Sequence, residues 1–147
     1  METTLVMRNL PDAPPARAAE RSARILLVED NELIRIDLVT ILELEGFEVR
    51  EATNGRSGLA QIEARSPDVV LSDLMMPEMD GYELLRRVRA NAAWASIPFI
   101  VLSARGEEEA VQRALELGAT AYLRKPVDIP DLLRAIRAPL GLPDAPA

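Results

Sequence analysis

The chain has 147 residues, of which 48% are hydrophobic, and a formal net charge of −7. A chain of this length and apolar content can build one full hydrophobic core but leaves no room for a second domain. It contains no cysteine and no histidine, which excludes disulfide bonds, thiolate chemistry and imidazole bases and leaves carboxylates, hydroxyls and lysine as reactive groups.

The first 23 residues are expected to form a flexible leader. They are rich in alanine, arginine and proline and have no sustained apolar period. They also lack the continuous hydrophobic stretch of a secretory signal. The longest apolar run of the chain, at residues 97–102, is far shorter than the roughly 20 residues of a membrane-spanning helix. We therefore expect no membrane segment and a cytoplasmic location.

From residue 24 onward, short apolar or β-branched runs alternate with helical patterns. Strands are predicted at residues 24–28, 47–52, 68–72, 97–103 and 120–124. Helices are predicted around the apolar face of Ile34, Leu38, Ile41 and Leu42, at 58–64, around Leu84, Leu85 and Val88, at 107–117, and after Asp128, which caps the last helix ahead of Pro130. Strands joined by helical crossovers run parallel, with helices on both faces of the sheet. The sequence therefore predicts an α/β fold, a doubly wound (βα)5 domain with a parallel five-stranded sheet at residues 24–138, and a flexible tail at 139–147.

Reactive side chains stand where four of these strands end. Glu29 and Asp30 follow RILLV, Asp73 follows DVVLS, Ser103 ends IPFIVLS, and Lys125 follows AYLR. The carboxyl ends of parallel strands share one edge of the sheet, and open α/β sheets bind their ligands at that edge. We therefore expect these residues to meet around one crevice, although they lie far apart in the sequence.

Each of these residues also has an ordinary structural explanation. Asp30 with Asn31 could cap the first helix, and Asp73 could form a turn. Ser103 could be a loop hydroxyl, and Lys125 could be a solvated lysine. Taken singly, these explanations are preferred for all of them except Asp73. Taken together, reactive groups at four strand ends on one edge favour a functional site.

The residue types suit phosphoryl chemistry. Carboxylates about 4 Å apart repel by about 4 kcal/mol per pair at an effective dielectric near 20, so a cation must sit among them. Hard oxygen donors in a partly open site suit Mg²⁺. With Mg²⁺ held by Glu29 and Asp30, the Asp73 carboxylate could attack a phosphoryl group whose oxygens Lys125 helps to neutralise. The Ser103 hydroxyl could then bind the new phosphoryl group and, by moving inward, bias a two-state surface.

These motifs make the chain resemble the receiver domains of bacterial two-component response regulators over about residues 24–138. The resemblance is carried by the acidic pair in VEDN, by SDLMMPEMDGYELL with Asp73, Pro77, Asp80 and Gly81, by Ser103-Ala104 and by Lys125-Pro126. It implies the flavodoxin-like strand order 2-1-3-4-5. It also implies a phosphorylation-activated signalling switch that is not an enzyme beyond catalysing its own phosphorylation and dephosphorylation.

The same resemblance assigns roles to individual residues. Asp73 is the phosphoacceptor, and it forms the Mg²⁺ site together with Asp30, the backbone carbonyl of Met75, and Glu29, which binds directly or through water. Ser103 and Lys125 complete the catalytic set.

Two further assignments concern the response to phosphorylation. Tyr122 matches the aromatic residue whose inward or outward position, together with Ser103, reports the phosphorylated state. Met75 and Arg105 occupy positions that tune the lifetime of the acyl phosphate in this family.

The expected partners are proteins. The chain has no histidine of its own, so the phosphoryl group would come from a sensor histidine kinase or a phosphotransfer protein. The segment after Ile136 is too short and proline-rich for an output module, which favours a stand-alone receiver acting on a downstream protein effector. Direct nucleic-acid binding is not expected, because the arginines at 86, 87 and 89 spread around a helix.

The surface used for output is expected on the fourth helix, fifth strand and fifth helix. Its charged residues are Glu107 to Glu109, Arg113, Arg124, Asp131 and Arg134. This mixed-charge surface could equally be a solvated face, and the family also uses it for homodimers.

Alternatives from other functional classes stay open at this point. A phosphoryl shuttle in a phosphorelay needs the same site residues. A phosphatase with an aspartyl nucleophile needs a second aspartate two residues after the first, where this chain has Met75. A flavodoxin-like cofactor binder needs a Gly/Ser/Thr-rich loop after the first strand, where this chain has EDNELI.

Overall fold

The computed structural model describes residues 5–7 and 22–143 of the chain. They form one sheet with the strand order β1-β6-β5-β4-β2-β3. The strands are β1 (Leu5–Met7), β2 (Arg24–Val28), β3 (Glu48–Ala52), β4 (Val69–Asp73), β5 (Phe99–Ser103) and β6 (Ala121–Arg124). Strands β2 to β6 run parallel, and β1 pairs antiparallel with β6.

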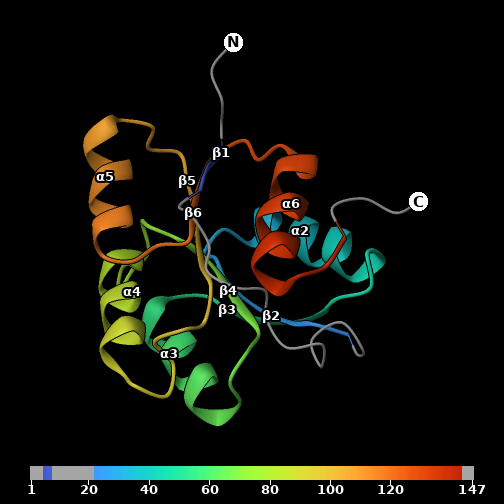
Figure 1. The fold of residues 1–147 in the computed structure, drawn as a ribbon, viewed down its shortest axis with the longest axis horizontal. Coiled ribbons are helices and arrows are strands. Elements are labelled where there is room, and N and C mark those ends of the chain that lie inside the picture. Colours follow the sequence, from blue (N-terminus) through green and yellow to red (C-terminus); the bar gives the residue numbers. More distant parts are fainter. Residues whose placement is uncertain (1–4, 8–21, 144–147) are drawn as a thin grey trace.

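In the described part of the chain, five helices cover the two faces of the sheet (Figure 1). They are α2 (Glu32–Leu44), α3 (Gly55–Ala64), α4 (Gly81–Ala90), α5 (Glu108–Glu116) and α6 (Ile129–Leu140). Helices α3, α4 and α5 pack on one face, in a cluster with Val28, Val70 and Val101. Helices α2 and α6 pack on the other face, with Leu27, Leu71 and Leu102. Alternate residues of the same strands thus serve two separate cores.

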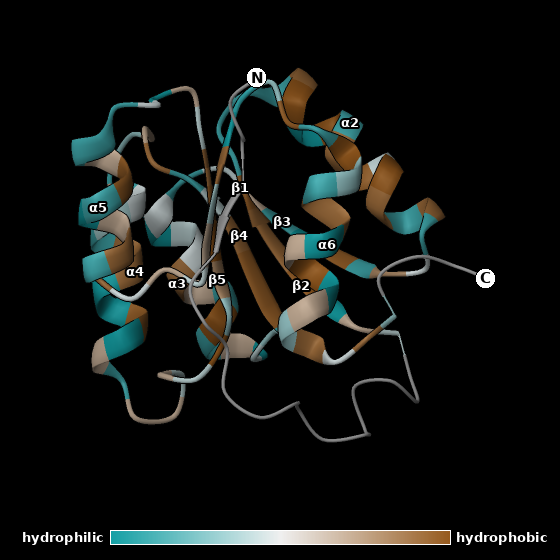
Figure 2. Cartoon of the chain, turned by 45° about the horizontal axis from the view of Figure 1, so that its top comes forward, coloured by the Kyte–Doolittle hydropathy of each residue, from teal (hydrophilic) through white to brown (hydrophobic). Residues whose placement is uncertain are grey.

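The central strands are apolar on both faces. Every residue of β4 and of β5 is buried, whereas in β3, at the edge of the sheet, three of the five residues are exposed and only Ala52 is buried. Figure 2 shows these central strands as hydrophobic and the outer faces of the helices as hydrophilic. A parallel sheet covered by helices on both sides requires this pattern.

Four of the five described helices have a start that is fixed by a polar side chain, and α5 is the exception. The caps Asn31, Asn54, Asp80 and Asp128 each accept a hydrogen bond from a backbone N–H three residues further on. At Asn54 the cap is reciprocal, because Ser57 also accepts from the Asn54 N–H. For this reason α3 begins at Gly55, ahead of the predicted start at residue 58.

The structure confirms the predicted α/β fold, with five parallel strands in the order 2-1-3-4-5 when β2 to β6 are counted in chain order. Besides the start of α3, two features differ from the prediction. Helix α6 runs to Leu140, past the predicted domain end at residue 138, because the Leu140 side chain is buried in the core beside α2. The strand β1 falls within the predicted flexible leader, and the rest of that leader up to residue 21 lies outside the described residues. Among the helices that the structure describes, none is long and apolar enough to cross a membrane.

Candidate functional site

Three carboxylates converge at the carboxyl edge of the sheet. Asp73 is the last residue of β4, and Glu29 and Asp30 follow β2 directly. One oxygen from each of these carboxylates lies within 4.8 Å of the other two. Glu29 and Asp73 are buried, whereas Asp30 is exposed. The cluster therefore has two buried members and one that faces the solvent.

Lys125 joins the two buried carboxylates. Its Nζ donates to Glu29 Oε1 at 2.8 Å and to Asp73 Oδ2 at 3.0 Å. Three carboxylates against this one ammonium group leave two formal negative charges, which is the charge that a divalent cation would neutralise. A short connection leads from Lys125 to the start of α6 at Ile129. The peptide bond between Lys125 and Pro126 is cis.

The pKa values of Glu29 and Lys125 are shifted by burial and by the contacts of the two side chains. Burial raises the pKa of Glu29, although hydrogen bonds from Lys125 and the Asn31 N–H act against this shift. Burial alone would lower the pKa of Lys125. The hydrogen bond to Glu29 and the charge of Asp73 outweigh burial, so the pKa of Lys125 is raised and its ammonium form is favoured.

Backbone groups hold the carboxylates in place. The Asn31 N–H donates to Glu29 Oε2 at 3.1 Å, and the Met75 N–H donates to Asp73 Oδ1 at 3.3 Å. Helix α2 is capped by Asn31, whose side chain accepts from the Ile34 N–H. The capping role therefore falls to Asn31 and leaves the Asp30 carboxylate at the cluster.

Arg35 is a site residue that sequence reasoning missed. Its Nη1 donates to the backbone carbonyl of Glu29 at 2.9 Å, and its Nε pairs with Glu51 of β3 at 3.1 Å. The side chain thereby ties the loop carrying Glu29 and Asp30 to both α2 and β3. The available signal was a basic residue one helical turn beyond the Asn31 cap, which points back toward the loop.

Ser103 and Tyr122 are connected through one loop. Ser103 Oγ accepts from the Arg105 N–H at 3.0 Å, and the Tyr122 hydroxyl donates to the Arg105 carbonyl at 2.6 Å. Both side chains are buried. Tyr122 therefore lies inward in this structure, and burial raises the pKa of its hydroxyl.

Close packing fixes the approach of α4 to the end of strand β4. The Gly81 N–H donates to the Leu74 carbonyl at 2.9 Å, and a Cβ at residue 81 would collide with the Asp73 carbonyl. Only glycine fits at this position, which explains the Asp80-Gly81 pair noted in the sequence. The segment between Asp73 and Gly81 includes Met75, whose side chain is exposed.

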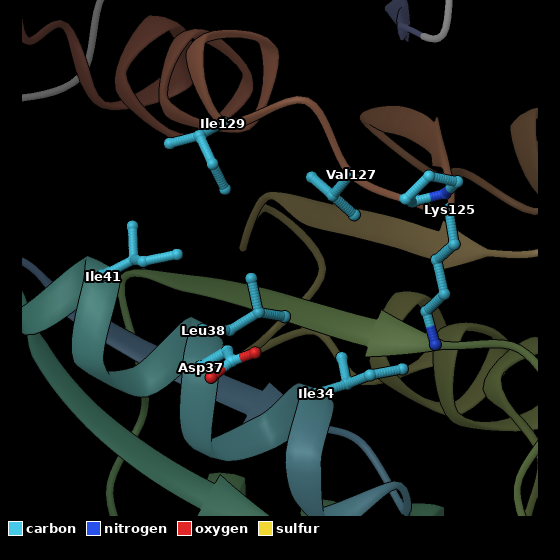
Figure 3. Close-up of a pocket in the computed structure, with 8 residues that line it drawn as sticks. Ile34, Asp37, Leu38, Ile41, Lys125, Val127 and Ile129 are labelled. Carbon is cyan, nitrogen blue, oxygen red and sulfur yellow. The ribbon is translucent and has the colours of Figure 1, made fainter.

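An apolar pocket borders the site on the side of α2. Its walls come from two regions, α2 and the connection from β6 into α6, and it is lined by Ile34, Asp37, Leu38, Ile41, Lys125, Pro126, Val127 and Ile129. Figure 3 shows the Lys125 side chain running along this pocket, with its nitrogen beyond Ile34. The aliphatic part of Lys125 therefore forms one wall of the pocket, while its ammonium group donates hydrogen bonds to Glu29 and Asp73.

The chemistry of this donor set fits Mg²⁺. Glu29, Asp30 and Asp73 offer carboxylate oxygens, the ligand type that this hard cation prefers. The exposure of Asp30 leaves an open side from which a phosphoryl group can approach. The site can therefore combine a cation, a carboxylate nucleophile and a lysine.

Comparisons with known proteins agree with this chemistry. A family model described as the response regulator receiver domain matches residues 25–137. The chain is 42% identical over 116 residues to the KDP operon transcriptional regulatory protein KdpE of Escherichia coli, covering 79% of this chain and 50% of KdpE. It is 37% identical over 119 residues to protein PilH of Pseudomonas aeruginosa, covering 81% of this chain and 98% of PilH.

One solved structure of similar fold contains a metal ion. The receiver domain of the sensor histidine kinase PA1611 from Pseudomonas aeruginosa, solved with a magnesium ion in its active-site cleft, superposes with a TM-score of 0.76 at 29% identity, covering 82% of this chain and 98% of that one. This chain spans about half the length of KdpE and of several other curated relatives that regulate transcription. From the family match and these relatives, the chain belongs to the response regulator receiver domains.

Proposed function

We propose that this domain is a phosphorylation-activated signalling switch in which Asp73 accepts a phosphoryl group from a protein phosphohistidine. The observation that carries the proposal is the double contact of Lys125 Nζ with Asp73 and Glu29, beside the exposed Asp30. The donor would be a sensor histidine kinase or a phosphotransfer protein, because this chain's sequence has no histidine.

The chain's own residues supply the nucleophile and its surroundings. A carboxylate oxygen of Asp73 forms a bond to phosphorus while the bond between phosphorus and the imidazole nitrogen of the donor breaks. The electron pair of that bond stays with the imidazole, which takes up a proton. Lys125, already 3.0 Å from Asp73, neutralises charge on the transferred oxygens.

A divalent cation would be held by the same carboxylates. We assign Glu29, Asp30, Asp73 and the Met75 carbonyl as the protein ligands of Mg²⁺. When bound, Mg²⁺ stabilises the negative charge on the phosphoryl oxygens. The two uncompensated charges of the cluster support this assignment.

The response to phosphorylation would pass through Ser103 and Tyr122. A phosphoryl group on Asp73 offers new acceptor oxygens, and the Ser103 hydroxyl can donate to one of them. Arg105 contacts both Ser103 and Tyr122, so a shift of Ser103 changes the hydrogen bond that keeps Tyr122 inward. Helix α5, strand β6 and helix α6 then present the altered surface to a downstream protein.

A protein donor is favoured by the apolar surface next to the site. Leu33 and Ile36 on α2 are exposed by 76% and 49%, and they lie on the helix that lines the apolar pocket. Large exposed apolar residues in one place are typical of protein-binding surfaces. A phosphoryl shuttle in a phosphorelay would use the same residues, and it differs from a switch only in passing the phosphoryl group on.

The experiment is intact-mass spectrometry after incubation with acetyl phosphate and Mg²⁺. Wild type should gain one phosphoryl group, and a chelator should prevent the gain. Asp73→Asn should stay unmodified, whereas Asp37→Asn, which removes an exposed carboxylate on α2, should react like wild type. Equal labelling of Asp73→Asn and wild type would refute the proposal. Back-transfer from the labelled domain to a histidine phosphotransfer protein would favour the shuttle.

A further inference from the structure

The edge strand of the receiver sheet is covered by a segment from the beginning of the chain. Strand β1 pairs antiparallel with β6, in the register Leu5 to Leu123, Val6 to Tyr122 and Met7 to Ala121, and it also contacts α6. Figures 1 and 2 show β1 between α5 and α6. Without β1, strand β6 would end the sheet and present unpaired N–H and C=O groups to any extended segment.

Strand β6 is also tied to the acidic site at its carboxyl end. The Lys125 N–H donates to the Ser103 carbonyl at 2.8 Å, directly after the last residue of β6. The Lys125 side chain contacts Glu29 and Asp73. A change in the groups that the Lys125 side chain contacts would therefore act on the end of β6.

A second connection reaches the middle of β6. The Tyr122 hydroxyl donates to the Arg105 carbonyl, and the Arg105 N–H donates to Ser103 Oγ. Tyr122 is the register partner of Val6. Recruitment of the Ser103 hydroxyl by a phosphoryl group would disturb this chain of hydrogen bonds at the residue that faces β1.

We propose that β1 is an intramolecular cap on the β6 edge, and that phosphorylation of Asp73 weakens this cap and opens the edge to a partner that adds a strand. This inference depends on the proposed function, because the trigger is the phosphoryl group. The cap can come from the same chain. Four strand spacings between β1 and β2 amount to roughly 19 Å, and the sixteen residues at 8–23 can span up to about 50 Å.

Linkage gives the proposal a reciprocal consequence. If a phosphoryl group weakens the pairing of β1 with β6, loss of that pairing must strengthen the binding of a phosphoryl mimic by the same factor. Coupling between two sites in one protein is typically five-fold or more. A variant without the cap should therefore bind the mimic at least about five-fold more tightly.

The test compares two full-length proline variants by hydrogen-exchange mass spectrometry. Val6→Pro removes a backbone donor and restricts φ within β1, and Ala13→Pro is the matched control outside the strand. Beryllofluoride with Mg²⁺ is the phosphoryl mimic. Val6→Pro should speed the exchange of the β6 amides at 121–124 without changing β4, and the mimic should speed the same amides in wild type and in Ala13→Pro. Val6→Pro should also show the tighter binding of the mimic.

Distinct results would overturn the proposal. Unchanged β6 exchange in Val6→Pro would show that β1 is no cap, and equal affinity of the two proline variants for the mimic would show that there is no coupling. Protection of β6 that rises with protein concentration would assign the covering strand to a second copy. Failure of the proposed function has its own signature: no variant would bind the mimic or react with acetyl phosphate, although Val6→Pro would still speed β6 exchange. That result would refute both the proposed switch and its coupling to β1.

Discussion

The two sides of the acidic site are held in different ways. On one side, the binding half consists of Glu29, Asp30 and Arg35, where a buried carboxylate, a capped helix and an arginine contact with the backbone fix one loop. On the other side, the relay half consists of Ser103, Tyr122 and Lys125, which are linked by hydrogen bonds in series through Arg105 and β6. A fixed loop suits the holding of a cation. A series of exchangeable hydrogen bonds suits the transmission of a change.

Removal of the exposed Asp30 carboxylate should impair the binding half and leave the relay half unchanged. Wild type should melt at a higher temperature in Mg²⁺, by roughly 5 °C at ten times the dissociation constant, because Mg²⁺ binds only the folded site. Asp30→Asn should lose nearly all of this shift, and Asp37→Asn should keep it. Thermal melts with and without Mg²⁺ measure both variants. A full shift in Asp30→Asn would remove Asp30 from the proposed ligand set.

Loss of the lysine should break the relay half. Lys125→Ala removes the contact that connects Asp73 and Glu29 with the end of β6. We expect some phosphorylation by acetyl phosphate to persist, together with loss of most of the structural response. Hydrogen exchange in residues 103–107 and 121–124, measured with and without beryllofluoride, reports that response. A response as large as that of wild type would mean that Lys125 plays no part in the relay.

A smaller effect is expected when the support behind the binding half is removed. Arg35→Gln should weaken Mg²⁺ binding by about ten-fold, which is typical for partners that orient metal ligands. Glu51→Gln is the matched control, because it removes the exposed ion pair but keeps the Arg35 contact with the Glu29 carbonyl, and such pairs contribute at most about 1 kcal/mol. Mg²⁺ titration of the melting temperature compares the two. Equal losses of affinity would show that the Glu29 carbonyl contact is irrelevant.

The smallest effect on stability is expected from removal of the leader. We propose that residues 24–138, with the helical extension to Leu140, carry the switch, so deletion of residues 1–22 should leave the melting temperature within a few degrees of wild type. Two-state melting monitored by circular dichroism provides the measurement. Unfolding of the shortened chain would show that the leader belongs to the core.

The sequence contained most of the fold and the composition of the acidic cluster. Alternation of apolar runs with helical periods predicts parallel strands, and parallel strands bring their carboxyl ends together. For this reason Glu29, Asp30, Asp73 and Lys125 could be placed at one edge without coordinates.

Other features depend on tertiary contacts that leave no local pattern. The contact of Arg35 with the Glu29 carbonyl depends on how α2 leans over its loop, and its pairing with Glu51 depends on the register of β3. Three residues are too few for strand β1 to show a period of two, and its pairing is decided by the free edge of β6. The start of α3 is a different case, because it is set by a local signal, the reciprocal cap between Asn54 and Ser57, rather than by the apolar residues of the helix.

The most direct test of the central claim is the position of the phosphoryl group. The domain would be incubated with acetyl phosphate and Mg²⁺, reduced with borohydride, digested and sequenced by tandem mass spectrometry. Reduction of an acyl phosphate on Asp73 converts that side chain to homoserine, so the peptide containing residues 69–79 should carry homoserine at position 73 in wild type and not in the chelator control. Homoserine at Asp30 or another aspartate, with Asp73 unmodified, would contradict the assignment of Asp73 as the phosphoacceptor.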